Sequence, residues 1–137
     1  MPHHSAKETP WSYTPDGGEI LFTAALEDPA SSVLFPKASM TELYAVSRTG
    51  GRPRQVLGTP AEELSFVGTS GAFVYQDCKG GENIWRKHHT SSITRDLWHY
   101  DGEKHTQLTS FAGEDRQPRL SADGKTVYFL SERDGSF

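Results

Sequence analysis

The chain has 137 residues and a formal net charge of −4 at pH 7, with 14 Lys and Arg against 18 Asp and Glu. This balance excludes binding to nucleic acid or to an anionic membrane through general positive charge. Only 34% of the residues are hydrophobic, the apolar runs are too short to span a membrane, and the lone cysteine, Cys78, cannot form an intrachain disulfide.

Residues 1–9 contain no apolar core of a signal peptide, and we expect them to form a disordered tail. A first unit of four short strands is predicted over residues 10–58. The turn at Asp16-Gly17 favours a tight hairpin, because glycine adopts positive φ without steric cost. The second strand, Ile20 to Ala24, is rich in β-branched and aromatic residues, and the third carries an acidic–Leu–aromatic step at Glu42 to Tyr44.

The same features return in the same order further along the chain. A second unit over residues 59–110 has a turn at Gly71 and an acidic–Leu–aromatic step at Asp96 to Trp98. A third, partial unit over residues 111–137 has a turn at Asp123-Gly124 and stops before its third strand. Four-stranded units repeated at roughly 40–50 residues are typical of β-propeller blades. The sequence therefore predicts an all-β fold of antiparallel four-stranded blades, about two and a half of them, as part of a larger propeller.

Two sets of residues resemble known families. The pattern Asp-Gly-Lys-Thr-Val-Tyr-Phe-Leu-Ser-Glu-Arg-Asp-Gly at residues 123–135 resembles the repeat of TolB-type propellers, and Pro15 to Phe22 is a shorter copy. The run from Trp85 to Trp98 is more particular, with Lys-His-His-Thr-Ser-Ser followed by Arg-Asp-Leu-Trp. Together with Gly113 to Arg116, it is similar to the N-terminal six-bladed propeller of tricorn-like serine peptidases.

The resemblance implies a function without chemistry of its own. In tricorn-like peptidases the propeller is non-catalytic and is a scaffold or gate for peptides that reach a separate peptidase domain. For this chain it implies no catalytic residue and no cofactor, with peptides and the rest of the parent protein as partners. It favours the periplasm and leaves the cytoplasm open. A TolB-like protein-binding propeller without an attached enzyme is the alternative.

A polysaccharide-active propeller is a third and weaker alternative. Such an enzyme needs paired carboxylates that face a central pocket. The spacing of Asp77, Glu114 and Asp115 is too loose to predict that arrangement.

A basic cluster with nearby acidic residues is the candidate site. Arginine presents forked donors that suit the carboxylates and carbonyls of a peptide. The alternative is a solvated loop in which Arg95 pairs with Asp96 or Glu82. The candidate substrate-path or loop residues are Arg86, His88, His89, Arg95, Glu114 and Arg116.

Other site chemistries find little support in the sequence. His88 and His89 would point to opposite faces of a strand, and no third ligand stands at a recognisable spacing, so a metal site is not predicted. The pair Ser91-Ser92 lies near a histidine, but no Gly-x-Ser-x-Gly elbow is present for a serine hydrolase. We interpret Cys78 as a partly buried structural residue rather than a reactive thiol.

The repeat also predicts which residues are buried and which are exposed. Tyr44 and Trp98 occupy the same repeat position and are predicted to lie in the core between blades. Because an incomplete ring cannot close, its end faces are expected to expose apolar residues near Leu43, Tyr44 and Tyr128. The truncated third unit would leave an unpaired strand edge after Val127 to Ser131, which is a template for another chain. As an isolated fragment the chain is therefore expected to form a homo-oligomer.

Overall fold

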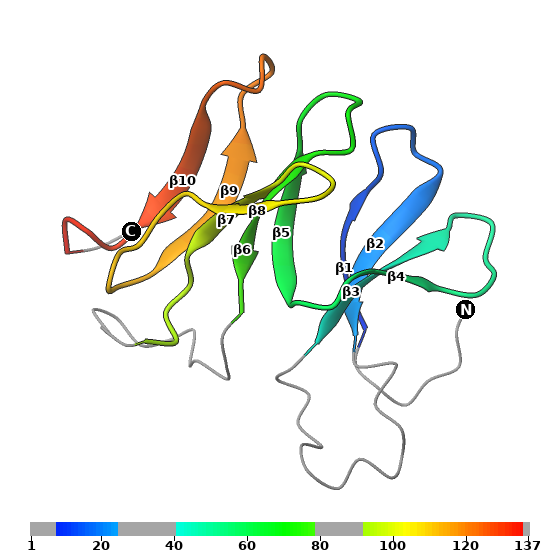
Figure 1. The fold of residues 1–137 in the computed structure, drawn as a ribbon, viewed down its shortest axis with the longest axis horizontal. Helices are drawn as coiled ribbons and strands as arrows, with labels where there is room; N and C mark the ends of the chain where they lie inside the picture. Colours follow the sequence, from blue (N-terminus) through cyan, green and yellow to red (C-terminus); the bar gives the residue numbers. More distant parts are fainter. Residues whose placement is uncertain (1–7, 25–40, 79–91, 136–137) are drawn as a thin grey trace, which may run out of the picture.

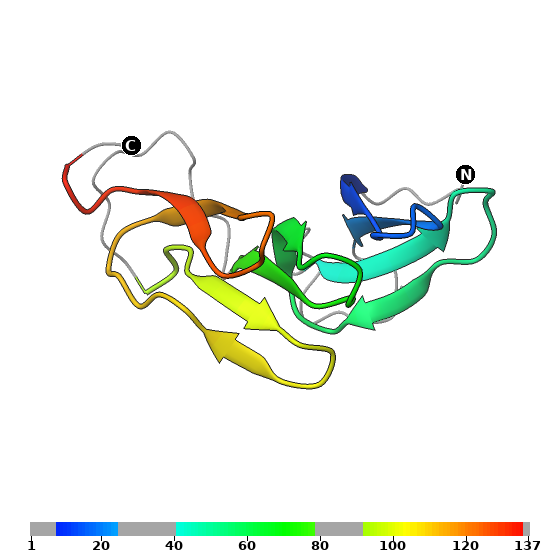
Figure 2. The ribbon, with the colours of Figure 1, turned by 90° about the horizontal axis from the view of Figure 1, so that it is seen from above.

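The computed structural model describes residues 8–24, 41–78 and 92–135, and over these ranges the chain forms ten β-strands and no helix. It follows that no described helix is long and apolar enough to cross a membrane. The strands make three antiparallel sheets that lie side by side in chain order (Figures 1 and 2). Within each sheet the strand order follows the chain, as expected for neighbours joined directly.

The first sheet contains four strands, which are β1 (Thr9–Tyr13), β2 (Glu19–Ala24), β3 (Glu42–Ser47) and β4 (Arg54–Leu57). A tight turn joins β1 to β2. The Gly17 N–H donates to the Thr14 carbonyl at 2.8 Å, and Gly17 has a φ of +68°. Hydrogen bonds from the Thr14 hydroxyl and the Gly18 N–H lower the pKa of Asp16 and hold its carboxylate over the turn. The predicted Asp-Gly hairpin is confirmed here.

The second sheet repeats this plan with β5 (Ala61–Phe66), β6 (Phe73–Asp77), β7 (Leu97–Tyr100) and β8 (His105–Gln107). The third sheet contains two strands within the described ranges, β9 (Asp115–Leu120) and β10 (Val127–Ser131). The prediction of an all-β fold with antiparallel four-stranded blades is confirmed. The unit limits at residues 58 and 110 remain predictions, and most of the expected N-terminal tail lies outside the described residues.

The turn between β5 and β6 differs from the turn between β9 and β10. Each begins with a backbone hydrogen bond of 2.8 Å across its base, donated by Val67 in one and by Ser121 in the other. Counting from these donors, Ser70 stands where the third sheet has Gly124, and Gly71 comes one residue later. The alignment of Gly71 with Gly124 from the sequence is therefore wrong by one position. The φ of +80° at Gly71 belongs to a turn of different shape.

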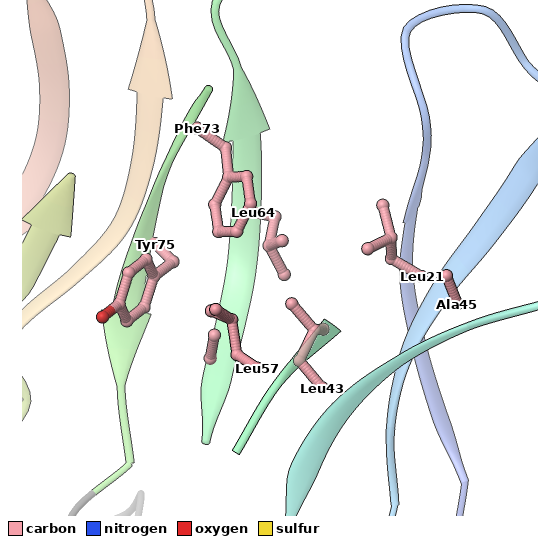
Figure 3. Close-up of a cluster of buried hydrophobic side chains, with 8 residues drawn as sticks. Leu21, Leu43, Ala45, Leu57, Leu64, Phe73 and Tyr75 are labelled. Atoms are coloured by element: carbon pink, nitrogen blue, oxygen red, sulfur yellow. The ribbon is translucent and has the colours of Figure 1, made fainter. Parts of the chain in front are cut away.

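The main apolar core lies between the first and second sheets (Figure 3). Alternate residues of each strand point into it, because successive side chains of a strand face opposite ways. We call this core the apolar seam, and its buried members are Leu21, Leu43, Ala45, Leu57, Ala61, Leu64, Phe73 and Tyr75. A smaller cluster buries Phe22, Ala24 and Tyr44, which are residues of β2 and β3 that alternate with those of the apolar seam.

Two expectations about exposure are corrected by the packing. Leu43 and Tyr44 are buried, Leu43 in the apolar seam and Tyr44 in the smaller cluster, so they do not form an exposed end face. Trp98 is half-buried rather than fully buried. It packs against the apolar seam, and its indole N–H donates to the Asp77 carboxylate at 2.9 Å. The predicted exposure of Tyr128 is confirmed, at 65%.

Candidate functional site

Three predicted site residues lie in the described ranges, and the fold brings them together. Nε of Arg116 donates to Oε2 of Glu114 at 2.9 Å, and Nη1 of Arg95 lies 3.5 Å from Oε1 of the same carboxylate. The backbone N–H of Arg95 also donates to Oε2 of Glu114 at 3.3 Å. The remaining three, Arg86, His88 and His89, lie outside the described residues.

These side chains meet between the second and third sheets, at a place we call the charged seam. Backbone contacts determine its position. The Asp115 N–H at the start of β9 donates to the Arg95 carbonyl, just before β7, at 3.1 Å. The Gln117 N–H donates to the side-chain oxygen of Gln76 in β6 at 2.9 Å. These contacts hold β9 against the second sheet. The side chains of the charged seam are Glu62, Arg95, Glu114, Asp115, Arg116 and Arg133.

β5 and β9, the first strands of the second and third sheets, each contain a bulge that orients their charged side chains. The β5–β6 and β9–β10 pairs change register at matching places, and Glu63 in β5 and Gln117 in β9 share a φ of +51°. Left-handed backbone is uncommon for residues other than glycine, and in a bulge it redirects the neighbouring side chain. Glu62, which precedes the first bulge, has Oε2 3.6 Å from Nε of Arg95. The seam therefore receives charges from both first strands.

Burial makes these ion pairs important. Glu114 and Asp115 are almost fully buried, and Arg95 is only 8% exposed. Removing one partner of a buried pair leaves an uncompensated charge, which costs several kcal/mol, about 3–5 in measured cases. Among the described residues Arg95 pairs with Glu62 and Glu114 rather than with the predicted Asp96. The Asp96 carboxylate accepts from Thr109 and Gln107 instead, and Glu82 lies outside the described residues.

A second ion pair extends the charged seam toward β10. Nη2 of Arg133 lies 2.7 Å from Oδ2 of Asp115, and the Arg133 side chain is 46% exposed. Its guanidinium lies 5.3 Å from the ring centroid of Phe111 and 5.6 Å from that of Phe129. Arg133 thus connects a buried carboxylate to the aromatic surface of β10, through an ion pair on one side and cation–π contacts on the other.

The hydrogen bonding of the charged seam is incomplete. Three buried atoms of the seam, Nη1 of Arg95, Oε1 of Glu114 and Oδ1 of Asp115, have no hydrogen-bond partner among the described residues. A buried polar atom without a hydrogen-bond partner costs about 1–3 kcal/mol, so these atoms lower the free energy of unfolding. Over the described ranges no three His, Cys, Asp or Glu side chains gather closely enough to hold a metal ion. The arrangement can position charge and accept hydrogen bonds.

Large apolar side chains are exposed on β10, beside the charged seam. The exposed fractions are 65% for Tyr128, 36% for Phe129 and 46% for Leu130. The strand is paired with β9, and in the part of the chain that the structure describes its outer edge has no neighbouring strand. An exposed apolar patch rimmed by charge is typical of an interaction surface.

Sequence reasoning missed Glu62 and Arg133 as members of the site. The repeat holds a signal for Glu62. It pairs with Gln76 in the second sheet as Arg116 pairs with Leu130 in the third, so two neighbouring units carry opposite charges at one position. Arg133 carries no comparable signal, because its contact with Asp115 depends on how the chain turns after β10.

Comparison with known proteins supports the fold and leaves the function open. No family model and no curated protein matches the sequence. Among solved structures, a protein assigned as TolB from Agrobacterium tumefaciens matches with a TM-score of 0.61 and 24% identity, over 90% of this chain and 38% of that one. TolB from Acinetobacter baumannii matches with a TM-score of 0.59 and 22% identity, over 96% of this chain and 28% of that one.

The chain therefore spans well under half the length of either TolB structure, and at this identity the likeness shows the fold alone. The predicted resemblance to TolB-type propeller blades is confirmed at that level. The more particular similarity to tricorn-like peptidases stays a prediction.

Proposed function

We propose that this chain is a non-catalytic propeller module that binds extended segments of other proteins. The observation that carries the proposal is the row of large apolar side chains exposed on β10, from Tyr128 to Leu130, beside the ion pair of Arg133 with Asp115. Apolar surface of this kind is favourably removed from water by a partner. The TolB-like fold supports the proposal, because it presents strands side by side on a rigid scaffold.

The charged seam supplies the rigid base that such a surface needs. Arg133 pairs with Asp115 at 2.7 Å within the third sheet, and Arg95, just before β7, ties that sheet to the second one through Glu114 at 3.5 Å. These contacts restrain β9 and β10 before any partner arrives, which reduces the entropy cost of binding. The exposed part of Arg133 offers a charged rim that favours an acidic partner.

The test uses the whole chain and a library of fluorescently labelled ten-residue peptides of varied sequence. We expect the fluorescence anisotropy of some peptides to rise and then level off as the chain is added. We also expect mass spectrometry to show every peptide uncleaved after incubation. Cleavage that disappears in Ser92→Ala would contradict a non-catalytic role. A library in which no peptide binds at any chain concentration would contradict peptide binding.

A second candidate is that the chain belongs to the propeller of a tricorn-like peptidase and gates peptide access there. One observation favours it. The two stretches that carry the resemblance, at Arg95 to Trp98 and Gly113 to Arg116, lie far apart in sequence but meet in the charged seam. A serine-peptidase domain encoded in the same reading frame would support this candidate. An intact frame that encodes a complete propeller and then stops would favour the TolB-like module.

A further inference from the structure

Aspartate is followed directly by glycine at four places in the loops of the described chain. Because glycine has no Cβ, its backbone nitrogen is sterically accessible to the carboxyl group of the residue before it. Such a pair can react with itself when the carboxyl group is free to move onto that nitrogen. The four pairs are Asp16-Gly17, Asp101-Gly102, Asp123-Gly124 and Asp134-Gly135.

Hydroxyl groups hold the carboxylate in two of these turns. Oδ1 of Asp16 accepts from the Thr14 hydroxyl at 2.6 Å, and Oδ1 of Asp123 accepts from the Ser121 hydroxyl. Each of the two oxygens also accepts from the backbone N–H two residues further along the chain, at 2.9 and 3.1 Å. Side chains of this kind commonly bond the backbone of their own turn.

Backbone N–H groups hold the carboxylate in the β7–β8 loop. Oδ1 of Asp101 accepts from the N–H groups of Lys104 and Glu103, at 2.8 and 2.9 Å. These bonds lower the pKa of Asp101, with the Lys104 bond as the largest cause. The pKa of Asp16 and that of Asp123 are lowered in the same way, chiefly by the hydroxyl group. All three carboxylates are therefore fixed and kept in the ionised form.

The turn after β10 has the same backbone and lacks this hold on the carboxylate. The Gly135 N–H donates to the Glu132 carbonyl at 3.0 Å, as the glycines after Asp16 and Asp123 do at 2.8 and 2.9 Å. Asp134 is exposed, and its carboxylate has no hydrogen bond or ion pair with any described residue. The position of the hydroxyl donor is taken by Glu132, and an ionised carboxylate has no proton to donate.

We propose that Asp134-Gly135 is a modification site, at which the aspartate isomerises to isoaspartate through a cyclic succinimide, and that hydrogen bonds protect the other three pairs. The Gly135 nitrogen loses its proton and attacks Cγ of Asp134. An N–C bond forms, a C–O bond of the carboxyl group breaks, and its hydroxyl leaves with a proton as water. One water molecule then opens the ring at either carbonyl, which gives aspartate again or isoaspartate.

The hydrogen bonds slow this reaction in two ways. The carboxyl group must leave its donors before Cγ can meet the glycine nitrogen, and bonds to a charged group are the strong ones. The carboxylic acid, which is the form that loses water, is also rarer where the pKa is lowered. The loss of one such bond changes an equilibrium by at least about tenfold, which sets the expected difference in rate.

The site adjoins the charged seam. Isoaspartate makes the backbone one carbon atom longer immediately after Arg133, whose Nη2 lies 2.7 Å from Oδ2 of the buried Asp115. A longer backbone at this point moves the guanidinium away from Asp115 and leaves a buried carboxylate without its cation. Isomerisation should therefore loosen the seam as well as alter the turn.

The experiment incubates the 137-residue chain in ¹⁸O-labelled water at neutral pH and maps its peptides by mass spectrometry. Opening of the ring places ¹⁸O in the new carboxyl group. We expect isoaspartate and ¹⁸O at Asp134 to accumulate at least about tenfold faster than at each of the other three pairs. In guanidinium chloride the four pairs should react at comparable rates, because only the folded chain protects three of them. Equal rates in the folded chain, or an unchanged order in denaturant, would overturn the proposal.

Two variants exchange the protection between equivalent turns. Ser121→Ala removes the hydroxyl donor of Asp123 and should raise the rate there about tenfold. Glu132→Ser places a hydroxyl group two residues before Asp134 and should slow that site. An unchanged rate at Asp123 in the first variant would show that hydrogen bonding does not protect the pair.

Asp134→Glu is the matched control, because it keeps the charge and would need a larger, six-membered ring. After the incubation, an isoaspartate-specific methyltransferase should methylate the parent chain at Asp134 and leave this site of the variant unlabelled. The urea midpoint of the parent should fall as isoaspartate accumulates, whereas that of the variant should stay constant. A constant midpoint in a parent chain that carries isoaspartate at this position would overturn the effect on the charged seam.

Discussion

The apolar seam and the charged seam join neighbouring sheets with the same backbone plan and opposite chemistry. Ala61 and Asp115 begin β5 and β9 at equivalent positions, and both are fully buried. Ala61 faces the leucines of the first sheet, whereas Asp115 needs Arg133 to pair its charge. Strand packing therefore sets which positions are buried, and the side chains decide how much stability the burial yields.

The two seams should differ in how they fail. Apolar burial is favourable for each side chain independently, at about 25 cal/mol per Å². A buried ion pair gains little over an apolar pair and is strongly destabilising only when one partner is removed. We therefore expect the apolar seam to contribute strongly to the free energy of unfolding. The charged seam should fix the second and third sheets relative to each other and add little net stability. Substitutions in each seam test that contrast.

The largest loss is expected in the apolar seam. Phe73 is 3% exposed and contacts the rings of Phe66, Tyr75 and Tyr100. Phe73→Ala should lower the free energy of unfolding by about 3–5 kcal/mol, because it leaves a cavity. Tyr13→Ala, at an exposed aromatic, should change it by less than about 0.5 kcal/mol. Urea unfolding followed by tryptophan fluorescence measures both, and coincident midpoints would contradict the position of the core.

The next effect concerns the charged seam. Glu114→Gln keeps the shape of the side chain but leaves Arg95 and Arg116 short of a negative charge, so it should cost about 3 kcal/mol. The control is Arg54→Gln, which breaks the exposed pair with Glu19 at 2.6 Å and should cost less than about 1 kcal/mol. Chemical unfolding of the two variants decides the point. A loss of the same size in both would show that burial does not govern these pairs.

A smaller effect is expected where the β9–β10 turn contacts the second sheet. Gly124 has a φ of +69°, and a Cβ added there would lie 2.7 Å from Cγ1 of Val67. Gly17 has a φ of +68° in the equivalent turn, with no atom within 4 Å of the added Cβ. Gly124→Ala should therefore cost about 2 kcal/mol and Gly17→Ala about 1 kcal/mol. Thermal unfolding of both variants tests the contact, and equal shifts in Tm would mean that Val67 moves aside freely.

The smallest effect near neutral pH is the titration of Tyr75 in the apolar seam. Burial, with the negative charge of Asp77 as a second cause, raises its pKa to about 12. The folded state therefore favours the neutral phenol, and its contribution to stability is complete below pH 10 and lost as the pH rises toward 12. Stability measured across that window should fall less steeply in Tyr75→Phe than in the parent chain. Parallel curves would contradict the shifted pKa.

The candidate site was only partly predictable from sequence. Arg95, Glu114 and Arg116 stand out as charged residues near strand ends, and they do meet. Their partners did not follow from the sequence, because Glu62 reaches Arg95 only through the bulge at Glu63 and the packing of β9 across the second sheet. Both depend on contacts between segments that are distant in the chain, which local patterns do not encode.

The kind of element, its order along the chain and the repeat follow from the sequence, because turns and strands depend on local φ preferences and on alternation along the backbone. Which of those strands are covered depends on packing between segments that are distant in the chain. Gln76 and Leu130 occupy equivalent positions, and the polar residue is 5% exposed while the apolar one is 46% exposed. Hydrophobicity predicts the reverse. Burial follows from the neighbouring elements, because β6 pairs with β7 at its edge and Gln76 accepts from the Gln117 N–H of β9, whereas among the described residues β10 pairs only with β9.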